Sequence, residues 1–284
     1  MTAIKRISAL ARPIVFSCLT NRIIVFVSLA AFAAMVIYQL TSGTPFFSAL
    51  VAGAGTGFAL FLSWALGREI DPANDWSAFA ALPFIFAAAP AYGAPALLPL
   101  LFLIFIGRGL SRSAGEQLTI LDSIMLVVFG MLLFFNGVVS APVFLAAVFL
   151  LDAVLVPVNR KQLYFALLAA AALGLSFPLL NSGQPGSGGF VTSTGIFALL
   201  LIAAAGFVIA VTGQDRVAGD SSGRPLENRR IALTQAAVAA IIVTELALKG
   251  YSALLVFYPA VLSYLGIALY HLLRILKTNI KVIA

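Results

Sequence analysis

Long apolar runs joined by short polar connections constrain this chain more than any other feature. A helix needs about 20 apolar residues to cross the roughly 30 Å hydrocarbon core of a bilayer. Only 10% of the residues are charged and 62% are hydrophobic, whereas a soluble domain has about 25% charged residues. We therefore predict an all-α, polytopic membrane helix bundle. Its clear spans are 23–40, 46–66, 118–138, 162–180, 190–212, 231–248 and 252–274.

Two further apolar stretches are interrupted by turn-forming residues. Residues 77–107 contain PAYGAP at 90–95. The apolar run after residue 138 begins with GVVSAP at 137–142. Proline and glycine punctuate helices in this way, so we predict short helices at 77–89, 94–107 and 142–157. The chain then has about ten transmembrane helices.

The basic residues divide unevenly between the two sides of this arrangement. With the N-terminus inside, the outer loops carry Lys249 alone and the inner loops carry the other basic residues. The positive-inside rule therefore predicts that both termini are cytoplasmic. The same rule explains the net charge of +7, so we expect membrane lipids as partners and no nucleic acid. Small size and minimal loops indicate a bacterial inner (cytoplasmic) membrane.

The N-terminal segment differs from the rest of the chain. Lys5, Arg6 and Arg12 surround apolar residues at helical spacing, and the following apolar run is too short for a signal peptide. We predict a cytoplasmic amphipathic segment at 1–21 that lies on the membrane surface. Residues 22–284 then form a single transmembrane domain.

The decapeptide GREIDPANDW, at residues 67–76, concentrates charge in an otherwise apolar chain. It holds three of the ten acidic residues, and Trp64 and Trp76, the only two tryptophans, lie near its ends. Indole rings favour the headgroup level, so we predict a tight cytoplasmic turn between the second and third spans. Asp71-Pro72 would stop one helix, and Asp75 or Ser77 would cap the next.

Ionisable residues inside a membrane span are functional candidates by default. Asp122 and Asp152 lie about one turn from the inner ends of their spans, and His271 is near the inner end of the last span. Glu245 and Lys249 are four residues apart near an outer end, which predicts a helix-surface ion pair.

Polar groups from several inner loops converge at the cytoplasmic face, where carboxylates would hold Mg²⁺ and arginines would clamp a phosphate. This pattern predicts a site that acts on a lipid-linked or isoprenoid phosphate. The candidate catalytic residues are Asp71, Asp75 and Asp122, of which Asp71 and Asp75 would bind Mg²⁺. The candidate substrate-binding residues are Arg68, Arg108, Arg112 and Asp152. The alternative interpretation is that these residues form ordinary ion pairs in polar loops.

Other metals and cofactors are disfavoured by the residue counts. Cys18 is the only cysteine and His271 the only histidine, so a cysteine cluster or a paired-histidine site cannot form. We therefore do not expect zinc, haem or iron–sulfur centres.

Asp71 and Asp75 form a D-x-x-x-D pattern after the second span. This pattern resembles the aspartate-rich motif of the UbiA family of intramembrane prenyltransferases. The chain lacks the asparagine-led residues upstream, and its later pair, Asp215 and Asp220, is spaced by five with only two spans following. The resemblance covers one short motif, and membership is not claimed.

Two other functions are open at this point. A small-molecule transporter or permease component would use the interrupted helices, with a pocket near mid-membrane around Pro90, Pro95, Asn136 and Pro142. A non-catalytic subunit of a membrane complex would need neither site. Gly53, Gly55 and Gly57 predict a close helix-packing face rather than a phosphate loop, because they lie mid-span and no lysine follows.

Overall fold

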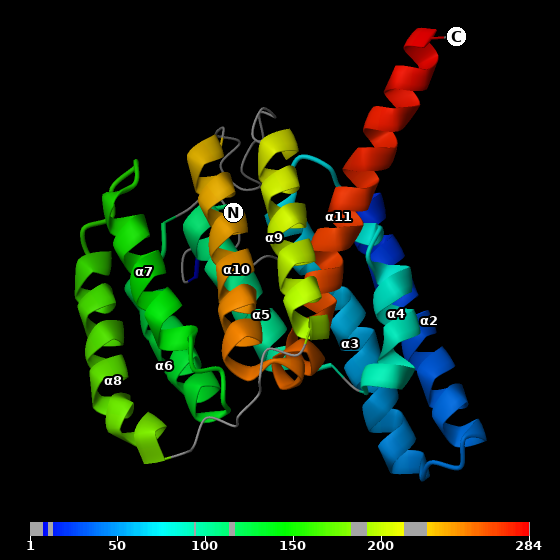
Figure 1. Ribbon diagram of the computed structural model, residues 1–284, viewed down its shortest axis with the longest axis horizontal. Coiled ribbons are helices and arrows are strands. Elements are labelled where there is room, and N and C mark those ends of the chain that lie inside the picture. The colour runs from blue at the N-terminus through cyan, green and yellow to red at the C-terminus, as the bar shows by residue number, and fades with distance from the viewer. Residues whose placement is uncertain are drawn as a thin grey trace.

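The computed structural model describes residues 8–10, 14–93, 95–113, 117–182, 192–212 and 226–283, and they form helices and connecting turns (Figure 1). Most of the predicted amphipathic segment 1–21 lies outside the described residues. The helices are α2 (Leu19–Thr41), α3 (Phe46–Ile70), η1 (Ser77–Phe79), α4 (Leu82–Tyr92), α5 (Leu97–Ser111), α6 (Ile120–Phe135), α7 (Ala141–Val154), α8 (Gln162–Ser182), α9 (Thr192–Thr212), α10 (Asn228–Lys249) and α11 (Tyr251–Ile283).

The predicted interruptions are real and divide the apolar stretches where expected. Gly93 ends α4 and Gly137 follows α6, both at positive φ, which glycine adopts without strain. The predicted helix 142–157 is three residues too long, because α7 ends at Val154. The cap prediction is wrong: η1 begins without a side-chain cap, since Asp75 binds Arg68 and Ser77 donates to the Asn74 carbonyl oxygen.

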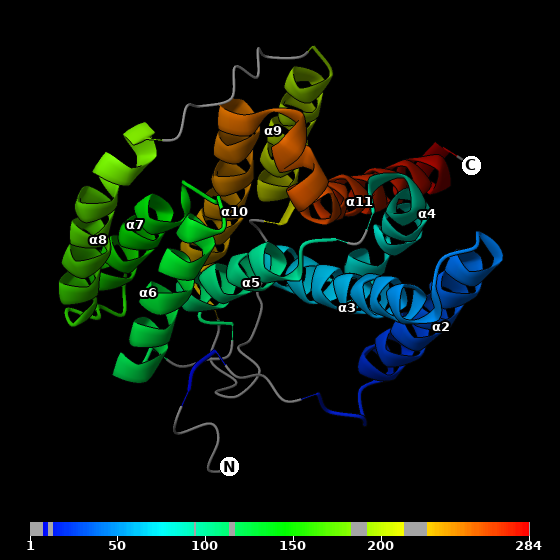
Figure 2. The same ribbon diagram turned by 90° about the horizontal axis from the view of Figure 1, so that it is seen from below.

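Consecutive helices run up and down (Figure 1), and seen from below α6, α7 and α8 lie on one side of the bundle and α2 and α4 on the other (Figure 2). The bundle therefore has two ends, and they differ in charge. We call one the basic end, at the top of Figure 1, where α3, α5, α7 and α9 finish and α10 starts. Lys249, the last residue of α10, lies at the opposite end. The described basic residues of the basic end are Arg22, Arg68, Arg108, Arg112, Arg160, Lys161, Arg229, Arg230, Arg274 and Lys277.

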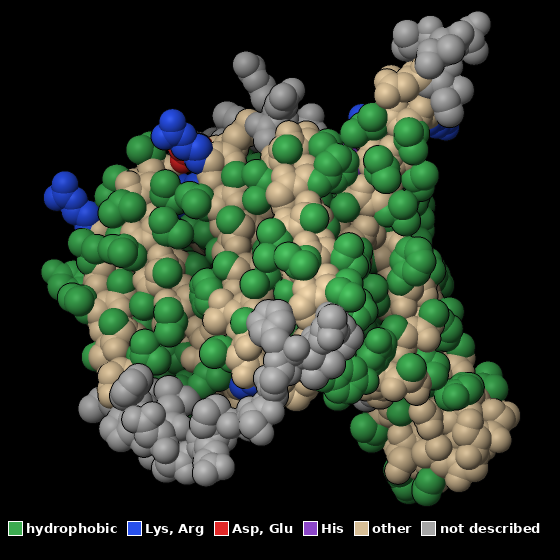
Figure 3. Space-filling view, in the orientation of Figure 1, with side chains coloured by type: hydrophobic (Ala, Val, Ile, Leu, Met, Phe, Trp, Pro, Cys, Tyr) green, Lys and Arg blue, Asp and Glu red, His purple; other side chains and the backbone are tan. Residues whose placement is uncertain are grey.

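The flank of the bundle is apolar. Figure 3 shows hydrophobic side chains over the visible flank, with lysine and arginine side chains toward the ends. Large exposed side chains include Phe26, Phe47 and Leu167, each more than two-thirds exposed. Within the described residues, α2, α3, α9, α10 and α11 are long and apolar enough to cross a membrane. A soluble monomer does not expose this much apolar surface, so these helices indicate an integral membrane protein.

Helices α2 and α3 pack closely through small residues. A Cβ atom added to Gly53 would lie 2.5 Å from Val36 Cγ2, and one added to Gly57 would lie 2.9 Å from the Ser28 carbonyl oxygen. The predicted packing role of these two glycines is therefore confirmed. Small residues four apart let helix backbones approach in lipid, where no hydrophobic effect holds helices together.

Candidate functional site

The charged turn after α3 is held against α11 by a buried pair. Asp71 caps the C-terminus of α3, and its Oδ2 lies 2.8 Å from His271 Nε2. Asn74 donates to Asp71 Oδ1 at 3.0 Å and accepts from Arg274 at 2.9 Å. Asp71 and His271 are both buried, so the turn is fixed to the last helix at two points.

Glu69, two residues earlier in the chain, joins α3 to α5. Its Oε1 accepts from Arg108 Nε at 3.0 Å, and its Oε2 accepts from Ser113 Oγ at 2.5 Å. Gly107 allows this approach, because a Cβ atom there would lie 3.2 Å from Glu69 Cβ. Polar groups of two of the inner loops that were predicted to converge are thus in contact, through Glu69 and Arg108.

Asp122 is buried and fully engaged by hydrogen bonds. Its Oδ2 accepts from the backbone nitrogen of Ala9 at 2.8 Å and of Thr119 at 2.9 Å, and its Oδ1 accepts from Ser8 Oγ. Thr119 and Asp122 also form a reciprocal capping box at the start of α6. This carboxylate therefore ties the N-terminal segment to α6, and its predicted catalytic role stays a prediction.

Asp152 lies between two arginines at the centre of the basic end. Its Oδ1 accepts from Arg112 Nη2 at 2.7 Å and from Arg230 Nη1 at 2.8 Å. Arg230 also donates to the backbone oxygens of Leu110 and Leu155, so it joins α5, α7 and α10. All three charged side chains are at least 93% buried. Burial lowers the pKa of the Arg112 guanidinium from its ordinary value, while the Asp152 carboxylate opposes that shift.

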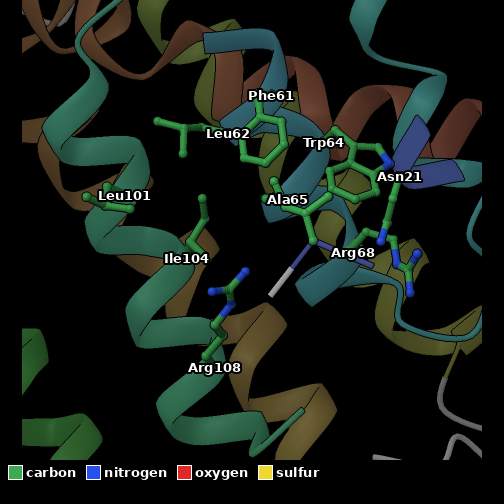
Figure 4. A pocket seen from close by; sticks show the side chains of 10 residues that line it. Asn21, Phe61, Leu62, Trp64, Ala65, Arg68, Leu101, Ile104 and Arg108 are labelled. Carbon is green, nitrogen blue, oxygen red and sulfur yellow. The ribbon is translucent and has the colours of Figure 1, made fainter. Parts of the chain in front are cut away.

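A small cavity of about 190 Å³, which we call the basic pocket, is lined by Arg108, the partner of Glu69. Figure 4 shows Arg108 reaching from α5 toward α3, where Arg68, Trp64 and Asn21 lie together. Apolar side chains of α3 and α5 form the walls. The lining residues are Ile14, Asn21, Phe61, Leu62, Trp64, Ala65, Arg68, Leu101, Ile104 and Arg108.

Two hydrogen-bond donors at the basic pocket have no acceptor. Trp64 Nε1 and Arg68 Nε are both buried, and neither has a partner among the described residues. The Arg68 guanidinium carbon lies 5.8 Å from the centre of the Trp64 ring, and Arg68 Nη1 binds Asp75 Oδ1 at 3.0 Å. A buried donor without a partner costs about 1–3 kcal/mol, so this geometry favours a ligand that accepts hydrogen bonds.

The structure distributes the predicted site residues over several environments. Arg68 and Arg108 share the basic pocket, whereas Arg112 and Asp152 bind each other in a separate buried cluster. Asp71 faces His271 and Asp75 faces Arg68. Among the described residues, no group of three or more Asp, Glu, His or Cys side chains could hold a metal ion. The Mg²⁺ site at Asp71 and Asp75 stays a prediction.

A second, larger cavity of about 520 Å³ lies at the opposite end, next to Asn136, and we call it the Glu245 cavity. Glu245 accepts from the Ser140 backbone nitrogen at 2.7 Å and from Lys249 Nζ at 2.8 Å. The predicted ion pair is confirmed, but Glu245 is only 1% exposed and so does not lie on the surface. Ala96, Asn136 and Lys249 line the cavity together with apolar side chains.

Sequence reasoning missed two contributors to these sites, Trp64 and Asn21. Trp64 was interpreted as a marker of the membrane surface, yet it is 7% exposed and packs near Phe61 and Phe79. Asn21 had no distinguishing pattern around it. The available signal for Trp64 was its spacing from Arg68, since residues four apart share one helix face.

Comparison with known proteins gives no guide to function. The chain matches no protein-family model, no curated protein and no solved structure. The contacts and cavities of this chain are therefore the basis for a proposed function.

Proposed function

We propose that this multi-pass membrane protein binds the phosphate group of a membrane lipid in the basic pocket. The supporting observation is the pair of buried, unpartnered donors, Trp64 Nε1 and Arg68 Nε, in a cavity that Arg108 also lines. A phosphate offers several strong acceptor oxygens, and arginine binds it with charge-assisted hydrogen bonds.

The size and walls of the basic pocket support a lipid ligand. Its volume of about 190 Å³ is below the roughly 300–1,000 Å³ of a typical small-molecule site, so it holds a headgroup rather than a whole ligand. Phe61, Leu62 and Leu101 form apolar walls beside the arginines. None of the described lining residues is a carboxylate, so the pocket supports recognition, and a reaction would need groups from outside it.

Binding is tested by the fluorescence of Trp64. The Trp76→Phe protein has Trp64 as its only tryptophan, and bromine on a lipid chain quenches indole fluorescence on contact. In uncharged detergent micelles, we expect brominated phosphatidic acid to quench Trp64 at lower concentration than phosphatidylcholine carrying the same chains. Arg68→Gln should raise the concentration needed by about tenfold or more, because a hydrogen bond to a charged group contributes about 1.5–3 kcal/mol.

Arg68 is the cleaner substitution of the two pocket arginines. Its partner Asp75 is 42% exposed and can be solvated when left alone, whereas Glu69, the partner of Arg108, is fully buried. Arg160→Gln, at an exposed position of the basic end, is the matched control and should leave quenching unchanged. Equal quenching by the two lipids, or an Arg160→Gln effect as large as that of Arg68→Gln, would contradict the proposal.

A second candidate function, a small-molecule carrier, is favoured by the Glu245 cavity. Its volume lies within the range of ligand sites, and Lys249 and Asn136 supply polar contacts. The cavity adjoins the predicted region around Pro95 and Asn136 but lies at the end of the bundle, not at its middle.

Orientation, and access to the Glu245 cavity, can be measured by cysteine labelling. We propose that the basic end is cytoplasmic, because lysine and arginine hold loops on that side. In a Cys18→Ser background, Ser252→Cys lines the cavity and should react with a membrane-impermeant maleimide added outside intact spheroplasts. Arg160→Cys should react only after lysis. The reverse pattern would overturn the orientation, and an unreactive Ser252→Cys would count against a carrier.

A further inference from the structure

We propose that one hydrocarbon chain of the bound lipid phosphate lies in the apolar groove between α2 and α3. This inference rests on the proposed function and adds the path of the chain. The groove has a volume of about 440 Å³ and adjoins the basic pocket, because Ile14 and Phe61 line both. A headgroup in the pocket and a chain in the groove would therefore belong to one molecule.

The groove has the surface chemistry that a hydrocarbon chain needs. Its walls include Val25, Leu29 and Phe32 from α2 and Phe58 from α3. Gly57, where the two helices approach closely, also lines it. Nearly all of its lining surface is apolar, and Ser28 is the one hydroxyl side chain among its described lining residues, so a hydrocarbon chain would lose no hydrogen bond on entering it.

The depth of the groove matches one leaflet. Ala54, at its deep end, precedes Arg68 by fourteen residues in the same helix, which corresponds to about 21 Å along the axis. Half of the hydrocarbon core is about 15 Å thick, and the headgroup layer adds to it. A lipid with its phosphate at Arg68 would thus place its chain beside Ala54 near the middle of the bilayer.

A neighbouring groove provides a contrast. On the other side of α2, Ala34, Leu82 and Phe86 line a groove of similar volume between α2, α3 and α4. It shares no lining residue with the basic pocket. General lipid contact would fill both grooves alike, whereas a bound lipid phosphate would use only the groove that begins at Ile14 and Phe61.

Substitution of one alanine in each groove, in the Trp76→Phe protein, distinguishes a bound lipid phosphate from general lipid contact. Ala54→Phe fills the groove that adjoins the basic pocket, and Ala34→Phe fills the other groove. With brominated phosphatidic acid as the probe, we expect Ala54→Phe to raise the half-quenching concentration about tenfold, because a filled groove excludes the chain. Ala34→Phe should change it less than about twofold. Glycerol 3-phosphate, which has no chain, should compete poorly with the lipid.

The possible results distinguish this inference from the proposed function. If Ala54→Phe and Ala34→Phe behave alike while Arg68→Gln still weakens quenching, the chain lies elsewhere and headgroup binding stands. If Arg68→Gln has no effect, both proposals fail. If glycerol 3-phosphate competes as well as the lipid, the ligand is a soluble phosphate and the groove plays no part. Thermal unfolding checks each variant, and Ala54→Leu should act in the same direction if Ala54→Phe does not fold.

Discussion

Asp152→Asn should lower the free energy of unfolding by about 3–5 kcal/mol, because it removes the carboxylate that two buried arginines share. Arg112 and Arg230 both donate to Asp152 Oδ1, and their side chains are 7% and 2% exposed. Asparagine keeps the shape of aspartate but supplies no negative charge. The two guanidinium groups would then repel each other in a site that water reaches poorly. Thermal unfolding in detergent measures the loss.

Glu227→Gln is the control for this prediction. Glu227 also faces Arg230, but its oxygen lies 3.7 Å from the arginine nitrogen and its side chain is 37% exposed. Exposed ion pairs contribute about 0–1 kcal/mol, so this variant should unfold almost as the parent protein does. An equal loss for the two variants would mean that overall charge at the basic end, not the buried contact, sets stability.

Gly266→Ala should prevent α11 from packing against the turn between η1 and α4. A Cβ atom at Gly266 would lie 2.6 Å from the Ala81 backbone nitrogen and 2.7 Å from its Cα. These are backbone atoms, so no side-chain rotation can relieve the contact. Overpacking costs about 1–3 kcal/mol where side chains adjust, and the cost here should lie at or above that range. A lower midpoint of thermal unfolding, with a smaller monodisperse fraction after purification, is the expected result.

Gly206→Ala makes the same chemical change where there is room. Gly206 lies in α9, and a Cβ atom there meets nothing within 4 Å. Alanine favours a helix over glycine by about 1 kcal/mol, so this variant should be neutral or slightly more stable. Two variants of equal stability would show that α11 shifts easily, and that the close contact at Ala81 is not required.

Helix placement followed from local patterns. Apolar runs near 20 residues predicted α2, α3, α10 and much of α11, and Pro/Gly interruptions predicted the divisions at Gly93 and Gly137. These features act within one segment, because a helix satisfies its own backbone hydrogen bonds in lipid. Helix ends were less predictable. Asp75 has the side chain of a good N-cap, yet its carboxylate pairs with Arg68 instead.

The distribution of lysine and arginine residues among the loops also predicted which end of the bundle is basic. Among the described residues, Lys249 is the basic residue at the opposite end, as the predicted arrangement of loops required. The sequence therefore predicted which residues lie at the polar ends of the bundle, because a charged side chain costs least free energy in a solvated loop. Arg68 and Arg108 were selected as phosphate ligands on this ground, and they do line one pocket.

The partner of each buried charge depended on packing between distant segments. Asp71 meets His271 200 residues later, and Asp152 meets Arg230 78 residues later. Trp64 became part of the candidate site because α3, α5 and the segment before α2 enclose its indole nitrogen. The local sequence pattern determines the length of each apolar helix, the positions of the turns and the charge of the loops. Helix packing determines which charges pair and which donors stay free, because a short-range contact exists only once two surfaces are brought within hydrogen-bonding distance.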